Sequence, residues 1–75
     1  MYKIGEFSKL VKIPVKTLRY YDQINLFVPS KIEQFTGYRY YSFQQIFDAK
    51  MILKLKDLGL SLEEIKEFLK TNDMN

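Results

Sequence analysis

The fold is decided by residues 12–21, which read KIPVKTLRYY. Pro14 interrupts one helix because its ring cannot continue the hydrogen-bond pattern, and it starts the next because a first-turn residue needs no N–H donor. The second helix begins at Val15. The first begins at Gly5 and places its apolar residues at i, i+3 and i+4: Phe7, Leu10 and Val11. Two helices separated by so short a turn predict a helix-turn-helix.

The outward side of the second helix is basic and aromatic. Both arginines of the chain and five of its six tyrosines lie in two segments, Arg19–Tyr21 and Tyr38–Tyr41. A guanidinium matches phosphate oxygens and guanine edges, and a tyrosine hydroxyl donates to phosphate. This pattern predicts DNA contacts from five residues of the second helix: Lys16, Thr17, Arg19, Tyr20 and Tyr21.

Packing is the alternative explanation for these residues. In that interpretation the tyrosines belong to the core, and Lys16 and Arg19 are ordinary solvated charges. Tyr21 shares a helix face with Leu18, so we expect it to lie partly in the core even if the helix binds DNA.

A hairpin follows the helix-turn-helix, and this order is typical of a wing. Residues 32–33 and 38–40 predict two short strands, with Gly37 supplying the positive φ of the turn. Arg39 with Tyr38 is the predicted phosphate or minor-groove contact. The alternative is a hairpin whose aromatic residues only stabilise one another across the strands.

Two more helices complete a mainly α fold, a winged helix-turn-helix of four helices and one short β-hairpin. Residues 42–45 predict a capping box for the third helix, with Tyr41 and Ile46 as its hydrophobic staple, and Gly59 predicts its end. Residues 61–64 predict a second capping box and a fourth helix. We assign residues 1–70 to the domain and residues 71–75 to a polar tail.

Lys54 and Lys56 lie near the end of the third helix and could reach a phosphate. Lysines are also favoured at a helix C-terminus by the helix dipole whatever the partner, so this second explanation stays open.

Composition limits the possible functions. The net charge is +3, and the first 42 residues carry seven basic against three acidic side chains, which fits a polyanionic partner. The chain has no cysteine and no histidine. We therefore expect no enzyme, no metal site and no cofactor. Apolar runs are too short for a membrane span, and we expect a cytoplasmic protein.

Four motifs in this order resemble the DNA-binding domain of the MerR family of bacterial transcription regulators. They are residues 4–6 (IGE), 17–22 (TLRYYD), 37–41 (GYRYY) and 58–65 (LGLSLEEI). The arginine-tyrosine motifs look most like the branch that senses drug-like organic molecules. One departure is Pro14, since family members commonly place serine or threonine before the recognition helix.

The resemblance implies a homodimer on a palindromic operator within a promoter spacer, which the dimer bends and untwists so that RNA polymerase can engage the promoter. It also implies a dimerisation helix and an effector domain after residue 75. By position, the contacts would be Lys16, Arg19, Tyr20 and Tyr21 in the recognition helix, Tyr38 and Arg39 in the first wing, and Lys56 in the second wing.

Two other functions fit the sequence less fully. One is a small architectural protein of the phage excisionase type, which bends double-stranded DNA for recombination. The other is a helical protein-interaction module, supported by the acidic last helix with its apolar residues Phe68 and Leu69.

Overall fold

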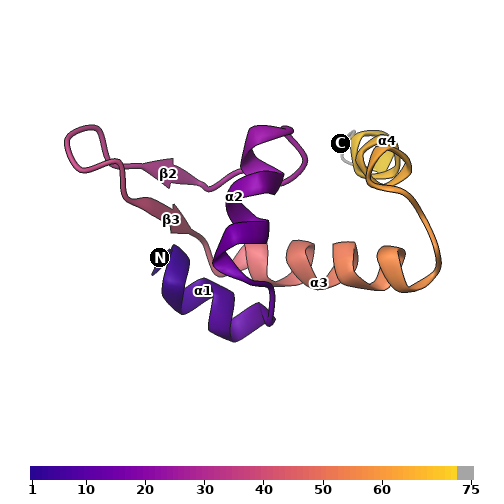
Figure 1. The fold of residues 1–75 in the computed structure, drawn as a ribbon, viewed down its shortest axis with the longest axis horizontal. Helices are drawn as coiled ribbons and strands as arrows, with labels where there is room; N and C mark the ends of the chain where they lie inside the picture. The colour runs from indigo at the N-terminus through magenta and orange to yellow at the C-terminus, as the bar shows by residue number, and fades with distance from the viewer. Residues whose placement is uncertain (73–75) are drawn as a thin grey trace.

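The computed structural model describes residues 1–72 and has the predicted architecture of four helices with a β-hairpin wing. The β2–β3 hairpin projects at one end of the molecule, α4 lies at the other, and α3 runs between them (Figure 1). Residues 73–75 of the predicted polar tail lie outside the described residues, and residues 71 and 72 belong to α4. In chain order the elements are β1 (Tyr2–Lys3), α1 (Ile4–Val11), α2 (Val15–Gln23), β2 (Lys31–Ile32), β3 (Arg39–Tyr41), α3 (Gln44–Asp57) and α4 (Leu62–Asn72).

The wing, which is the β2–β3 hairpin, is part of a three-stranded antiparallel sheet in which β1 is the third strand. Its strand order is β1-β3-β2, and Tyr2 pairs with Tyr41 across β1 and β3. Lys31 pairs with Tyr40 on the other side. The sheet therefore ties the N-terminus of the chain to the wing.

Residues in the left-handed backbone conformation follow three of the helices. Lys12 (φ 59°) ends α1, and the Ser8 hydroxyl donates to the Ile13 carbonyl at 2.6 Å across the turn. Asn25 (φ 61°) follows α2 and Gly59 (φ 94°) follows α3. After α3, the amide of Gly59 bonds to the carbonyl of Lys56, and Leu60 to Leu55, which is the Schellman arrangement. The predicted glycine cap is confirmed.

The two predicted capping boxes differ in completeness. At α4 the box is complete, because the Ser61 amide donates to Glu64 Oε1 at 2.8 Å and the Glu64 amide donates to Ser61 Oγ at 3.1 Å. At α3 only half of it forms. Gln45 Oε1 accepts the Ser42 amide at 2.9 Å, while the Gln45 amide bonds to the Ser42 carbonyl.

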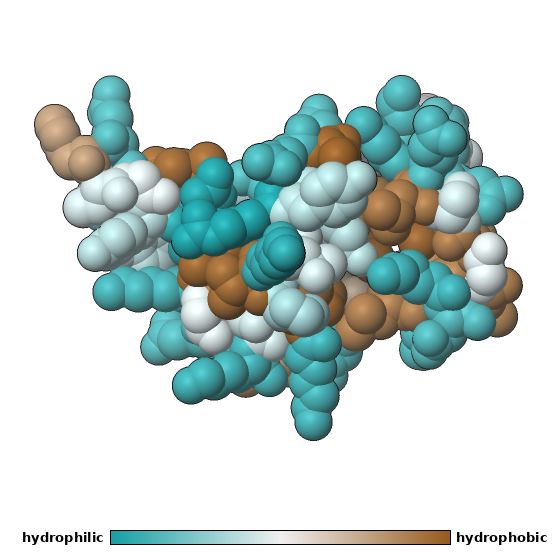
Figure 2. Space-filling view, viewed as in Figure 1, coloured by the Kyte–Doolittle hydropathy of each residue, from teal (hydrophilic) through white to brown (hydrophobic). Residues whose placement is uncertain are grey.

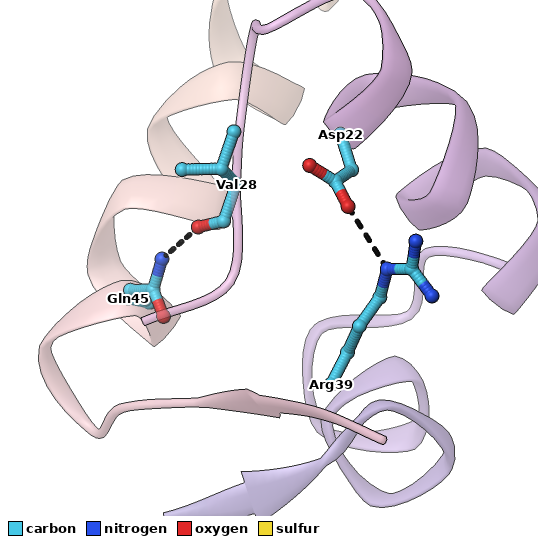
Figure 3. A network of polar contacts seen from close by, with 4 residues as sticks. All are labelled: Asp22, Val28, Arg39 and Gln45. Atoms are coloured by element: carbon cyan, nitrogen blue, oxygen red, sulfur yellow. Dashed lines mark hydrogen bonds and ion pairs between the residues drawn. The ribbon is translucent and has the colours of Figure 1, made fainter. Parts of the chain in front are cut away.

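Gln45 has a further structural role. Its Nε2 donates to the Val28 carbonyl at 2.6 Å (Figure 3), and its Oε1 also accepts the Ser30 hydroxyl at 2.7 Å. One side chain thus joins the loop after α2 to the start of α3.

Three stacked aromatic rings form the centre of the core. Each ring contacts the other two: the ring centroid of Tyr41 lies 4.5 Å from that of Phe7 and 5.8 Å from that of Phe27, and the two phenylalanine centroids lie 6.0 Å apart. The rings come from β3, α1 and the loop after α2. Leu10 follows the same apolar spacing as Phe7 and Val11, but it is 47% exposed. The short helix α1 buries only the narrower face of Phe7 and Val11.

The Tyr41 hydroxyl is an exception to the rule that buried polar groups are paired. The side chain is fully buried, and the hydroxyl has no hydrogen-bond partner within residues 1–72. Burial raises the pKa of Tyr41 to about 12, and the nearby Asp22 carboxylate adds to this rise, while Arg39 and Arg19 oppose it. The hydroxyl is therefore neutral over the physiological range.

Replacing Tyr41 with phenylalanine tests this arrangement. We expect Tyr41→Phe to increase the free energy of unfolding by up to about 1 kcal/mol at pH 7, because the ring stack remains and an unpaired buried hydroxyl is removed. The native chain should lose stability as the pH rises from the unfolded pKa of 10 through about 12, because only the unfolded state ionises readily in that window.

Urea denaturation at pH 7 and pH 11 would measure both effects, with the half-buried Tyr40→Phe as control. The variant should lose less stability than the native chain between the two pH values. A marked loss of stability in Tyr41→Phe at pH 7 would show that the hydroxyl has a partner.

Candidate nucleic-acid interface

The exposed face of α2 carries three of the predicted contact residues. Lys16, Arg19 and Tyr20 are all exposed, and their i, i+3, i+4 spacing places them side by side on the helix. Tyr20 is 48% exposed, although its ring is 6.5 Å from that of Tyr21. The opposite face is anchored by the buried Leu18, so the helix presents these side chains from a fixed base.

Tyr21 and Thr17 occupy less exposed positions. Tyr21 is 2% exposed and belongs to the core, as its shared face with Leu18 predicted. Lys56 Nζ donates to its hydroxyl at 3.4 Å, which joins α3 to α2. Thr17 is half-buried. Neither residue presents a large free surface.

Arg39 is held in place by α2. Its Nε donates to Asp22 Oδ2 at 2.9 Å, and both side chains are partly buried (Figure 3). Sequence reasoning did not single out Asp22, although it follows Arg19 by three residues on the helix. The ion pair fixes the wing against α2 and orients the guanidinium.

Tyr38 lies on the outside of the wing. It is 52% exposed, and Lys3 Nζ lies 5.2 Å from the centre of its ring, a cation–π distance. The contact crosses from β1 to the wing. Sequence reasoning missed Lys3 because β1 and β3 are far apart in the chain.

An open groove of about 700 Å³ joins α1, α2 and the wing. It brings together Arg19, Tyr38 and Arg39, three of the predicted contact residues, but not Lys16, Tyr20 or Lys56. The groove contains four cationic side chains and one carboxylate, that of Glu6, which accepts the Lys3 amide at 3.1 Å. Its lining residues are Lys3, Ile4, Gly5, Glu6, Lys9, Arg19, Thr36, Gly37, Tyr38 and Arg39.

A second groove has the opposite character. It is about 490 Å³ in volume and lies between the loop after α2, α3 and α4, where Figure 2 shows apolar residues gathered between α2 and α4. Asp48 and Gln45 are its polar members. The others are Leu26, Phe27, Val28, Phe47, Met51, Phe68 and Leu69.

Within residues 1–72, no group of three or more histidine, cysteine, aspartate or glutamate side chains is arranged to hold a metal ion. None of the helices in this part of the chain has the length and apolar content needed to cross a membrane.

The family model described as MerR HTH family regulatory protein matches residues 2–72. The chain belongs to the MerR family. The resemblance predicted from the four sequence motifs is thereby confirmed.

Relatives in the family are transcription regulators. The chain is 47% identical over 66 residues to the multidrug-efflux transporter 1 regulator of Bacillus subtilis, a match covering 88% of this chain and 24% of that protein. It is 45% identical over 69 residues to the multidrug-efflux transporter 2 regulator of the same species, covering 92% and 25%. The chain thus spans about a quarter of the length of these relatives. The heavy metal-dependent transcription regulator 2 of Rhizobium meliloti is 38% identical, covering 88% of this chain and 44% of that protein.

Solved structures give the same family. A cryo-EM structure of an EcmrR-DNA complex in EcmrR-RPo has a TM-score of 0.87 and 36% identity, covering 99% of this chain and 27% of that one. The crystal structure of MtaN, the N-terminus of the Bacillus subtilis multidrug transporter activator, has a TM-score of 0.80 and 34% identity, covering 92% and 64%.

A double-mutant cycle would measure how firmly α2 holds the wing. We expect a coupling energy of about 1 kcal/mol between Asp22→Ala and Arg39→Ala in the free energy of unfolding. The reason is that the pair is partly buried and its two atoms lie 2.9 Å apart. Asp48→Ala with Arg39→Ala serves as the uncoupled control. Additive single effects would mean that the ion pair does not secure the wing.

Proposed function

We propose that this chain binds double-stranded DNA in a sequence-specific manner as the DNA-binding domain of a bacterial transcription regulator. The observation that supports this best is the cationic groove, because it joins Arg19 of α2 to Tyr38 and Arg39 of the wing on one continuous surface. Two elements that would follow adjacent grooves of a duplex thus share one positively charged concavity.

The proposed docking places α2 in the major groove. Lys16, Arg19 and Tyr20 then meet base edges and flanking phosphates, since all three are exposed on one helix face. Tyr38 and Arg39 contact phosphates beside the adjacent minor groove. In this arrangement Asp22 holds Arg39 Nε and leaves the terminal nitrogens of the guanidinium directed to a phosphate.

Three predicted contacts have a narrower proposed role. Thr17 is half-buried and would reach only a phosphate close to the helix. The hydroxyl of Tyr21 and the ammonium of Lys56 are already bonded to each other, so we propose that they approach one phosphate together. Lys56 would then act as the contact of the second wing, around Gly59.

We further propose that the chain acts within a longer, cytoplasmic protein as a homodimer on a palindromic operator. Two linked copies would anchor both halves of a promoter spacer and distort it, so that RNA polymerase is affected indirectly through the DNA. Bending a site of this length costs on the order of 1–6 kcal/mol, which several charge-assisted phosphate contacts can offset.

The apolar groove supports a second candidate function, a protein-interaction surface at the opposite end of the molecule. Phe47, Met51 and Phe68 line it and are each substantially exposed. This surface is compatible with DNA binding by α2. The architectural, excisionase-type alternative differs in that it would show little preference among sequences.

Replacing Arg19 tests the DNA-binding proposal. We expect Arg19→Ala to weaken binding to a duplex selected from random sequence by roughly 1–3 kcal/mol and to narrow the difference between selected and random DNA. The reason is that Arg19 lies in the cationic groove and on the exposed face of α2. Fluorescence anisotropy across a salt series measures both affinity and its salt dependence.

The matched control is Lys70→Ala, which removes one positive charge from the last turn of α4. It should leave affinity and sequence preference almost unchanged. Equal effects of the two substitutions would show that binding depends only on non-specific charge attraction. If the native chain failed to bind DNA at low salt, the proposal would be disproved.

A further inference from the structure

Phe35 is the most exposed large apolar side chain in the described part of the molecule, at 96%. It lies in the loop between β2 and β3, which projects furthest from the helices (Figure 1). Full burial of a phenylalanine side chain gains about 1.5–3 kcal/mol, and the free chain realises almost none of this gain at Phe35. The ring is therefore available to a partner.

The loop that carries Phe35 is held by hydrogen bonds on both sides of the turn. The Glu33 amide donates to the Tyr38 carbonyl and the Gly37 amide to the Glu33 carbonyl, each at 2.8 Å. The Tyr38 amide also donates to Thr36 Oγ1 at 3.2 Å, and Gly37 adopts a φ of 75°. These contacts fix the backbone on which the ring is presented, so binding would order only the side chain.

The charges around the loop favour a polyanion. Lys31 is exposed on β2, Arg39 lies at the start of β3, and Lys3 lies over the ring of Tyr38. Glu33 is the one acidic residue of the hairpin, and it is partly buried. An apolar ring at the tip of a cationic hairpin suits a partner that combines two rows of anionic groups with apolar walls between them, as the phosphates and sugars of the DNA minor groove do.

The reach of the hairpin matches the spacing of grooves on DNA. A strand advances about 3.3 Å per residue, so the six residues from Tyr41 at the base of β3 to Phe35 at the tip span at most about 20 Å. One turn of B-DNA is about 34–36 Å long, so a major groove and the adjacent minor groove lie about half that distance apart. With α2 in the major groove, the tip reaches the adjacent minor groove.

We propose that Phe35 inserts its ring into this minor groove, as an apolar wedge against the sugars and bases of one base step. The proposal rests on the proposed DNA-binding function and adds a residue to it. A wedge of this kind unstacks the step and favours flexible pyrimidine–purine steps. Phe35 would thus contribute to sequence preference at a position that α2 does not touch.

The test compares the native chain with Phe35→Ala on a selected duplex. We expect a five- to tenfold loss of affinity with an unchanged slope of log affinity against log salt, because the ring carries no charge. A duplex with 2-aminopurine at the wing-proximal base step should brighten when the native chain binds and stay dark with the variant. Phe43→Ala, which removes a phenylalanine that is 62% exposed just before α3, is the matched control.

Three outcomes separate the possibilities. Equal affinity of Phe35→Ala and the native chain, with equal 2-aminopurine signals, would overturn the wedge and leave DNA binding intact. A loss of affinity shared by Phe43→Ala would also overturn it. Failure of the native chain to bind any duplex would remove the DNA-binding function itself and the wedge with it.

Discussion

The wing and the recognition helix depend on one stack of three aromatic rings. Tyr41 packs against both Phe7 and Phe27, so a single residue at the base of β3 contacts both α1 and the loop that follows α2. A domain of 75 residues has room for only a small core, and no disulfide or metal supplements it in residues 1–72. The angle of the wing against α2 is therefore set largely by how these rings pack.

The Arg39–Asp22 ion pair orients the hairpin relative to α2. The ring contacts fix the end of β3 at Tyr41, and the ion pair fixes how Arg39, at the start of β3, meets α2. The pair is partly buried, so salt screens it less than a surface pair. It orients the Arg39 side chain as well as contributing to stability. Orienting a guanidinium before the partner arrives reduces the side-chain entropy lost on binding.

Local patterns predicted most of the fold, because the relevant interactions lie within a few residues. Gly59 determines the end of α3 and the Ser61 capping box determines the start of α4, through hydrogen bonds between residues at most five positions apart. The pairing of β1 with β3 could not be predicted in this way, since it joins Tyr2 to Tyr41 and depends on the whole core. Lys12 was equally unpredictable, because a lysine carries no preference for the left-handed conformation it adopts.

The same distinction explains which residues of the cationic groove could be predicted from the sequence. Arg19, Tyr38 and Arg39 stand in short arginine-tyrosine motifs, and the groove brings all three together. Lys3 lines the groove because β1 pairs with β3, and Lys9 lines it because α1 packs beside α2; no local pattern shows either contact. The fold thereby gathers positive charge at the end with the wing, while the last helix, α4, begins with the acidic Glu63 and Glu64. A polyanion is attracted toward the wing and away from α4, which leaves the apolar groove between α3 and α4 free of competition from DNA.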